Sequence, residues 1–222
     1  MTITTVVFLI IRHDTEIGQG GTTMVTQYSE LRSHLKTGDV VLFSGKGGLS
    51  AGIKFATGSK WSHVGLVYFL EEYNLMALWE STTLSKFKDI DTGKYNKGVQ
   101  IVPLSERIRT YDGEVNIRRL NKALSSDHHA QLVELRELYK GKPYELNEIE
   151  LIKAAFDGPF GANEADISSL FCSELVADAY QKLGILDKTL PANEYTPSDF
   201  SSDTEIDLLS GYALEEEIAV AA

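Results

Sequence analysis

Three side chains of this sequence are of the types that carry out nucleophilic catalysis: a cysteine, a histidine and a glutamate. Cys172, the only cysteine, lies at the start of a helix predicted over Phe171–Leu183, with Ser168 or Ser169 as its cap. Free backbone N–H groups and the helix dipole favour a thiolate at such a position, and the thiolate is the form that attacks carbonyl carbons. A buried cysteine that acts as a small hydrophobic residue is the alternative.

His63 and Glu80 lie on two predicted neighbouring strands that are joined by the polar connection Glu71–Asn74. If this connection is an even-numbered turn, Glu80 lies opposite Gly65, and His63 is its diagonal neighbour on the same face of the sheet. A connection of odd length would place Glu80 on the other face. Each residue also has a simpler interpretation, His63 as a structural hydrogen-bonding residue and Glu80 as a charge that faces solvent.

Brought together, these residues would form a thiol hydrolase site. Cys172 would be the nucleophile, and His63 would be the base that takes the thiol proton and later protonates the leaving group. Glu80 would fix the tautomer of the imidazole and stabilise its charged form. The backbone N–H of Cys172, at the predicted start of the helix, is a candidate donor to the oxyanion.

A β-rich first half and a helix-rich second half have to position these residues. The predicted strands are Val40–Phe43, His63–Leu70, Leu75–Glu80, Val99–Val102 and Glu114–Arg119. The predicted helices are Ser50–Thr57, a helix from Ser125 or Ser126 to Gly141, Asn147–Phe156 and Phe171–Leu183. One face of the last helix is apolar and predicted to be buried, and it carries Leu175, Val176, Ala179, Tyr180 and Leu183.

The composition is that of a globular protein with enough apolar residues to form a core. Of 222 residues, 43% are hydrophobic and 24% are charged, which excludes a disordered chain. With 21 Lys and Arg against 32 Asp and Glu, the formal net charge is −11. This balance argues against a nucleic-acid partner and against electrostatic docking on anionic membranes. A single cysteine excludes an internal disulfide and a cysteine-rich zinc site.

The glycine-rich segment Gly45-Lys46-Gly47-Gly48 is not a phosphate-binding loop. Such a loop needs a glycine, four residues and then Gly-Lys-Ser/Thr, and this spacing is missing here. The sequence implies neither a metal nor an organic cofactor. We therefore interpret the segment as a mobile loop.

The chain is predicted to contain one main domain over residues 35–200. Residues 1–34 form an N-terminal extension, with Met24 as an alternative start, and residues 201–222 form an acidic segment that is expected to be solvated. The apolar run Val6–Ile11 is too short to span a bilayer and lacks the flanks of a signal peptide. The cytoplasm is therefore the default location, although a phage-encoded or released protein fits equally well. The oligomeric state does not follow from the sequence.

Several motifs are similar, in type and in order, to those of one enzyme family. Gly141-Lys142-Pro143-Tyr144, followed by Phe171-Cys172-Ser173-Glu174-Leu175-Val176, resembles the nucleophile region of NlpC-type papain-like cysteine peptidases. In the usual members the histidine and the third polar residue follow the cysteine, whereas here Trp61–Val67 and Trp79–Thr82 precede it. This order resembles the circularly permuted branch of YiiX/YebB-like proteins, over about Leu35 to Phe200. Three further segments resemble that branch: Lys36–Phe43, Val102–Arg107 and Thr196–Phe200.

The resemblance implies an α+β, papain-like fold in which a small antiparallel sheet packs against helices. It assigns the nucleophile, the base and the orienting carboxylate to Cys172, His63 and Glu80, the residues that their chemistry suggests. It also implies that Tyr144 helps to bind the oxyanion, with a core tyrosine as the alternative. Glu145 stands where similar sequences often carry Asp.

The resemblance leaves three functions open. The first is a cysteine peptidase or amidase that acts on a cell-wall peptide or a related amide. The second is a lipid-directed acyltransferase or esterase, because the permuted branch is also similar to lecithin–retinol acyltransferase-like enzymes. The third is an inactive module that binds lipids or peptides. Cys172-Ser173-Glu174 looks more like the amidase motif, so amide hydrolysis ranks first, and the segments Gly45–Gly58 and Tyr144–Leu170 are expected to shape the groove.

Overall fold

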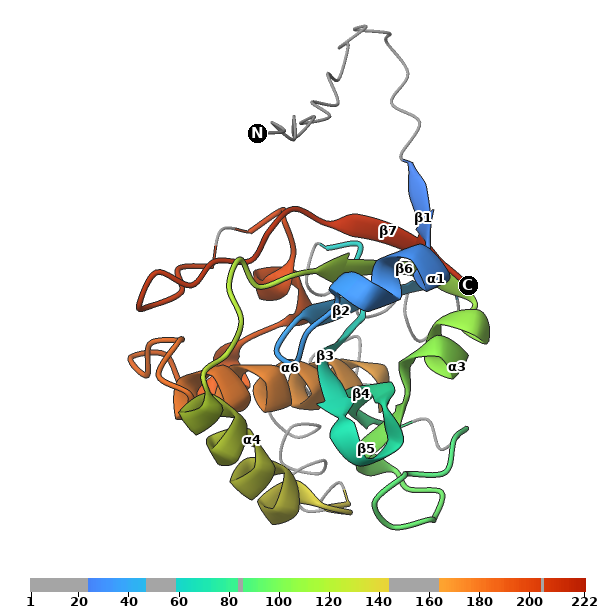
Figure 1. Cartoon of the computed structure of the whole chain (residues 1–222), viewed down its shortest axis with the longest axis horizontal. Coiled ribbons are helices and arrows are strands. Elements are labelled where there is room, and N and C mark those ends of the chain that lie inside the picture. The colour runs from blue at the N-terminus through green and yellow to red at the C-terminus, as the bar shows by residue number, and fades with distance from the viewer. Residues whose placement is uncertain (1–23, 47–58, 84–85, 144–163, 205) are drawn as a thin grey trace, which may run out of the picture.

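Apolar runs in the first half of the chain form the centre of one seven-stranded sheet (Figure 1). The computed structural model describes residues 24–46, 59–83, 86–143, 164–204 and 206–222. The strands are β1 (Val25–Gln27), β2 (Val40–Gly45), β3 (His63–Leu70), β4 (Leu75–Thr82), β5 (Gly98–Pro103), β6 (Gly113–Arg118) and β7 (Ile218–Ala221). Their order in the sheet is β1-β7-β6-β2-β3-β4-β5, and all neighbours are antiparallel except β1 and β7.

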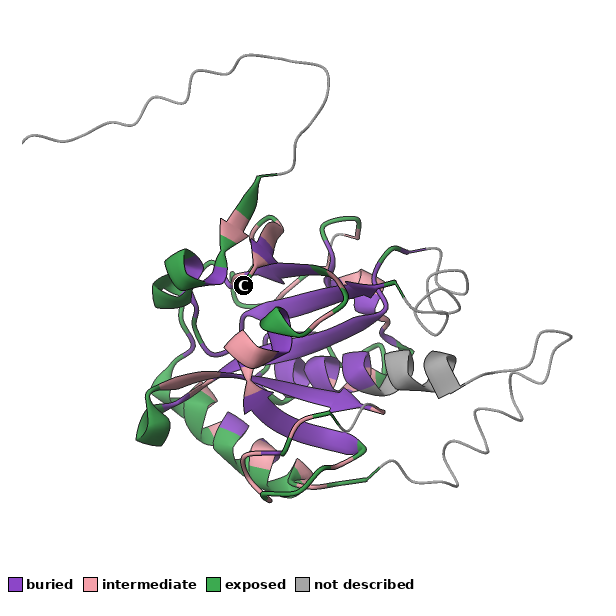
Figure 2. Ribbon diagram, turned by 90° about the vertical axis from the view of Figure 1, so that its right-hand side faces the viewer, coloured by how far each residue is buried: buried purple, intermediate pink, exposed green. Residues whose placement is uncertain are grey.

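The five predicted strands are confirmed, each within two residues of its predicted ends. The strands β2 and β3 lie at the centre of the sheet and are buried almost throughout (Figure 2). Alternate residues of a strand point to opposite faces, so a sheet with apolar residues on both faces has to be covered on both.

Helices cover both faces of this sheet. The helices are α1 (Tyr28–Leu31), α3 (Leu104–Arg109), α4 (Ser126–Tyr139) and α6 (Glu164–Lys182). Short 3-10 turns follow at Arg32–His34, Glu71–Tyr73, Ala192–Glu194 and Pro197–Phe200. The helices α1 and α3 pack over one core with Val41 and Phe43 of β2, and α4 and α6 pack over the other with Val40 and Leu42. The predicted α+β fold, an antiparallel sheet packed against helices, is confirmed.

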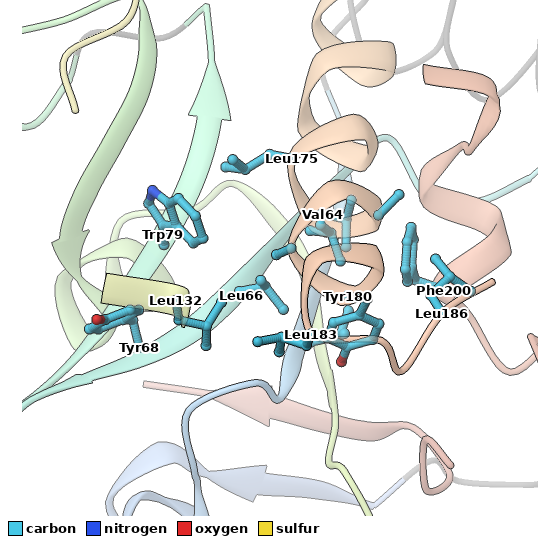
Figure 3. Packing of buried hydrophobic residues seen from close by; sticks show 14 of the residues in the cluster. Val64, Leu66, Tyr68, Trp79, Leu132, Leu175, Tyr180, Leu183, Leu186 and Phe200 are labelled. Carbon is cyan, nitrogen blue, oxygen red and sulfur yellow. The ribbon is translucent and has the colours of Figure 1, made fainter. Parts of the chain in front are cut away.

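The larger core lies between α6 and the centre of the sheet (Figure 3). Leu175 and Tyr180 of α6, and Leu183 directly after it, pack against Val64 and Leu66 of β3. These helix residues are those predicted for its apolar face, and each is at most 5% exposed. The core also contains Cys172, so the packing of α6 fixes where the sulfur lies.

The start of α4 and the end of α6 lie where the sequence predicts them, whereas the start of α6 does not. Ser125 caps α4, since its side chain accepts a hydrogen bond from the backbone N–H of His128. Gly184 follows α6 with φ of 67°, in the left-handed region that suits a residue after a helix end. The start of α6 was predicted wrongly, because the helix begins at Glu164 instead of near Phe171. The predicted helices Ser50–Thr57 and Asn147–Phe156 lie outside the described residues.

The two ends of the described chain meet in the sheet (Figure 1). The strand β7 pairs with β6, and β1 adds to β7 as the edge strand. The Glu217 carboxylate accepts hydrogen bonds from the Asn116 side chain and the Ser202 backbone N–H, each at 2.8 Å. Part of the acidic segment, which the charge pattern predicts to be solvated, is therefore built into the sheet. Val220 lies in the core that α1 and α3 cover.

Candidate active site

The hairpin of β3 and β4 brings His63 and Glu80 together. Leu70 pairs with Leu75 around a four-residue connection, and Leu66 pairs with Trp79, so the predicted even-numbered register is confirmed. The connection closes through Asn74, which has φ of 48°. Glu80 therefore lies on the same face of the sheet as His63, with Gly65 between them.

Gly65 is required where it stands because the two strands approach closely around the site. A Cβ atom at this position would lie 2.9 Å from Cδ1 of Leu78, 3.1 Å from the Trp79 carbonyl oxygen and 3.2 Å from Cβ of Glu80. Such contacts are closer than side-chain carbons tolerate without movement. The absence of a side chain lets the Glu80 carboxylate extend toward His63.

The base and the carboxylate are in direct contact, and the thiol completes the arrangement. Nε2 of His63 lies 2.6 Å from Oε2 of Glu80. The Cys172 side chain hydrogen-bonds to the same imidazole. His63 is 8% exposed, and Glu80 and Cys172 are fully buried. The structure thus assembles the three residues that the sequence singled out.

Two residues that the sequence analysis did not assign to the site hold the Glu80 carboxylate from the other side. Nε2 of Gln100, on β5, donates a hydrogen bond to Oε1 of Glu80 at 2.9 Å. Nε of Arg107, on α3, lies 3.0 Å from the same oxygen. Arg107 stands in one of the segments that resemble the permuted branch, but its sequence context gave it no role. Glu80 is therefore a buried carboxylate and does not face solvent.

The electrostatics of the group favour a charged imidazole. Burial raises the pKa of Glu80, but the charge of Arg107 and the contact with His63 outweigh it and hold this pKa down at about 2. Burial lowers the pKa of His63, but the charge and hydrogen bond of Cys172, together with Glu80, raise it to about 9. At neutral pH His63 therefore favours the imidazolium form beside an ionised Glu80. This is the state in which a thiolate–imidazolium pair reacts.

A family model that covers most of the chain shows to which family the protein with this arrangement belongs. A family model described as "Permuted papain-like amidase enzyme, YaeF/YiiX, C92 family" matches residues 34–204, well over half of the chain. The chain belongs to this family. It is accordingly a papain-like hydrolase of the cysteine peptidase and amidase type, as the sequence motifs predict.

The C92 assignment rests on the family model alone. One similar solved structure is the crystal structure of metalloprotein yiiX from Escherichia coli O157:H7, with 20% sequence identity and a TM-score of 0.45. That match covers 83% of this chain and 88% of the other chain. Among curated proteins, none matches this one.

Cys172 of this C92 protein does not lie at a helix terminus. It is the ninth residue of α6, counted from Glu164 to Cys172. The helix dipole acts mainly on the first turn, and a backbone N–H inside a helix is already bonded to the carbonyl four residues earlier. The predicted roles of the helix start, in favouring the thiolate and in binding the oxyanion, are therefore corrected. What the structure shows beside the thiol is the hydrogen bond with His63.

Tyr144, the predicted oxyanion-binding residue of the C92 site, lies outside the described residues, as do most of the two segments expected to shape the groove. Another tyrosine, Tyr111, lies near the site, and its side chain hydrogen-bonds to Ser62. Burial is the main cause that raises the pKa of Tyr111, and the charges of Glu80 and Cys172 raise it further. The position of Tyr111 next to the site could not be inferred from the sequence, because it depends on how α3 packs.

The described residues of this C92 chain include neither a cluster of metal-binding side chains nor a membrane-spanning helix. They contain no group of three or more His, Cys, Asp or Glu side chains that could hold a metal ion. Within the same residues, no helix is both long and apolar enough to cross a membrane.

Proposed function

We propose that this protein hydrolyses an amide bond through an acyl-enzyme on Cys172, with His63 as the base and Glu80 as the orienting carboxylate. The observation that carries the proposal is the 2.6 Å contact between His63 Nε2 and Glu80 Oε2, together with the hydrogen bond between Cys172 and the same imidazole. A nucleophile in contact with a base that a third group orients is the arrangement of activated thiols and hydroxyls.

The chemistry proceeds in two steps. The Cys172 thiolate attacks the amide carbonyl carbon, the C–N bond breaks, and the His63 imidazolium gives its proton to the leaving amine. Water then attacks the thioester, with neutral His63 as the base, and releases the carboxylic acid and the thiolate. The Glu80 carboxylate stays ionised throughout, because Arg107 and Gln100 hold it in place.

An amide, such as a cell-wall peptide, ranks before a lipid ester as the substrate. The support is the Cys172-Ser173-Glu174 motif and membership of an amidase family. A lipid-directed acyltransferase or esterase with the same residues is the alternative, and a binding module without turnover is the second alternative.

A matched set of four chromogenic substrates tests the proposal: a short peptide and a long fatty acid, each as the p-nitroanilide and as the p-nitrophenyl ester. Rates are corrected for the Cys172→Ala background, and intact-mass spectrometry looks for an acyl group on Cys172. The control for His63→Ala is His129→Ala, which changes an exposed histidine on α4.

We expect the peptide anilide to turn over, with an acyl adduct on the wild type and on His129→Ala but not on Cys172→Ala. His63→Ala should lose roughly 10³-fold or more of the rate, as expected for a lost general base. Turnover of the fatty-acyl ester alone would favour the lipid-directed alternative. Absence of any turnover or adduct would contradict the proposal and leave the binding module.

A further inference from the structure

Arg107 is a charged side chain placed behind the active site, where the protein buries it almost fully. It is 4% exposed and stands on the short helix α3, between the partly exposed Glu106 and the buried Ile108. Arg109, two positions along the same helix, shows the ordinary arrangement: its side chain is 61% exposed and pairs with Glu106 at the surface. Burying a guanidinium is costly unless partners compensate it, so its partners show what it does.

The first partner of Arg107 is the carboxylate that contacts the base. Nε of Arg107 lies 3.0 Å from Oε1 and 3.3 Å from Oε2 of Glu80. Gln100 donates to Oε1 as well, at 2.9 Å. Gln100 thus binds Oε1, Arg107 spans both oxygens and lies closer to Oε1, and Oε2 faces Nε2 of His63. The orientation of Glu80 is thus set from behind by β5 and α3.

The second set of partners of Arg107 is aromatic, and one of these rings is a neighbour of His63. The guanidinium carbon of Arg107 lies 4.6 Å from the ring centre of Phe43 and 5.1 Å from that of Tyr111. The Phe43 ring lies 5.4 Å from the His63 ring, to which it is tilted. A guanidinium over an aromatic face is stabilised by the ring electrons. Arg107 therefore supports His63 by two routes, through a carboxylate and through a ring.

A charge count shows why the guanidinium matters for the thiol. The titratable and charged groups that face the His63–Glu80 pair in the described structure are Cys172 from α6, Arg107 from α3 and Tyr111 from the α3–β6 connection. With a thiolate, an imidazolium, a carboxylate and a guanidinium, the site is neutral. Without the guanidinium it would carry one buried negative charge, and uptake of a proton relieves such a charge.

We propose that Arg107 is a positioning residue that keeps Glu80 ionised and aimed at His63, and that it thereby keeps Cys172 reactive at neutral pH. The proposal rests on the proposed function of Cys172, His63 and Glu80. It adds a fourth member to the site, which acts through its contacts with Glu80.

The test measures the rate of Cys172 alkylation by iodoacetamide as a function of pH, in a chain where Cys172 is the only cysteine. Arg107→Met removes the charge, and Arg107→Lys keeps it with a single donor. Arg109→Met is the matched control on the same helix. Near-UV circular dichroism checks the fold of each variant, and Arg107→Gln replaces Arg107→Met if the latter does not fold.

We expect wild type and Arg109→Met to label rapidly well below pH 8.5, at about which an ordinary thiol is half ionised. Arg107→Met should label at least tenfold more slowly at pH 7, with its profile moved to higher pH, and Arg107→Lys should recover most of the wild-type profile. An Arg107→Met profile that coincides with wild type would overturn the inference, as would an equal shift in a folded Arg107→Lys.

The same experiment separates this inference from the proposed function on which it rests. If wild type labels slowly at neutral pH, or if His63→Ala labels like wild type, the thiolate–imidazolium pair is absent and the proposed function fails. If wild type depends on His63 but not on Arg107, only the role of Arg107 fails.

Discussion

Glu80 and Asp39, two carboxylates in the described part of the chain, are both fully buried but have contrasting partners. Glu80 contacts charged groups, the Arg107 guanidinium and the His63 imidazole. Asp39, at the start of β2, accepts hydrogen bonds from two backbone N–H groups, of Lys36 at 2.8 Å and of Leu120 at 2.9 Å. Both side chains are inaccessible to solvent, so the difference between their protonation states comes from the groups that they contact.

The pKa values follow the partners. Burial raises the pKa of Asp39 to about 6, because backbone hydrogen bonds and more distant cations only partly compensate the lost solvation. For Glu80 the same burial is outweighed by Arg107 and His63, which hold its pKa at about 2. We infer that Asp39 has a structural role, because it links the turn at Lys36 to the segment that follows β6, whereas Glu80 stabilises the charged form of the base.

The largest effect should come from exchanging each carboxylate for its amide. Glu80→Gln should lower kcat/KM for the best amide substrate by roughly 10³-fold, because an amide neither stabilises the imidazolium nor fixes its tautomer. Asp39→Asn, the matched change at the other site, should stay within about threefold of wild type. Steady-state kinetics at pH 7 measure both variants. Equal losses in the two variants would show that the comparison is wrong.

A smaller effect should appear in the pH dependence of stability, with opposite signs for the two carboxylates. Between about pH 4 and 6 the native state holds the Asp39 proton more tightly than the unfolded chain, so the free energy of unfolding should fall as the pH rises. Between about pH 2 and 4.5 the unfolded chain holds the Glu80 proton more tightly, so stability should rise with pH. Each share is on the order of 3 kcal/mol.

Urea unfolding of wild type, Asp39→Asn and Glu80→Gln at several pH values separates the two contributions. Asp39→Asn should lose the fall between pH 4 and 6 and keep the rise at lower pH. Glu80→Gln should do the reverse. A fall between pH 4 and 6 that survives in Asp39→Asn would assign that titration to other groups.

A smaller loss of stability is expected from Gly65→Ala, which displaces the strands β3 and β4 that carry His63 and Glu80. The new methyl group would meet Leu78 and the Trp79 carbonyl oxygen, so β3 and β4 have to separate slightly. We expect a loss of about 1–2 kcal/mol in unfolding free energy, typical of overpacking, together with slower alkylation of Cys172 at pH 7. Thermal unfolding and iodoacetamide labelling measure the two effects. Unchanged labelling would mean that the His63–Glu80 contact tolerates the displacement.

The smallest effect is expected at the surface of α3. Arg109→Met breaks the exposed pair with Glu106, and such pairs contribute little because solvent screens them. We expect no measurable change in the unfolding midpoint or in the alkylation profile. A clear change would show that α3 as a whole, and not the Arg107 side chain, controls the site.

The sequence predicts the parts of the site that depend on local pattern. The register of β3 and β4 follows from apolar runs around an even-numbered polar connection, and this register brings His63 to Glu80. The family motifs place Cys172 with them. Each of these inferences uses neighbours in the chain, or a strand pair joined by a short turn, where the choice of pairings is small.

The rest depends on tertiary packing. Arg107 lies between the partly exposed Glu106 and the buried Ile108, and only the packing of α3 on the sheet buries it against Glu80. The start of α6 was misplaced because Ser168 and Ser169 are good caps, yet the four residues before them, from Glu164 to Ile167, contain no helix breaker. A cap contributes only about 1 kcal/mol, which the remaining interactions of a long helix can outweigh. Similarly, β1 and β7 are short strands whose pairing needs a partner far away in the chain.

The most direct test of the central claim is an NMR titration of His63 in protein labelled with ¹⁵N-histidine, with the signal assigned by its loss in His63→Ala. The account predicts that His63 stays an imidazolium until the pH approaches about 9, since Cys172 and Glu80 stabilise its charge. In Cys172→Ala the midpoint should fall, because the largest stabilising partner is removed. A wild-type midpoint near 6.5, the ordinary value for histidine, would contradict the account.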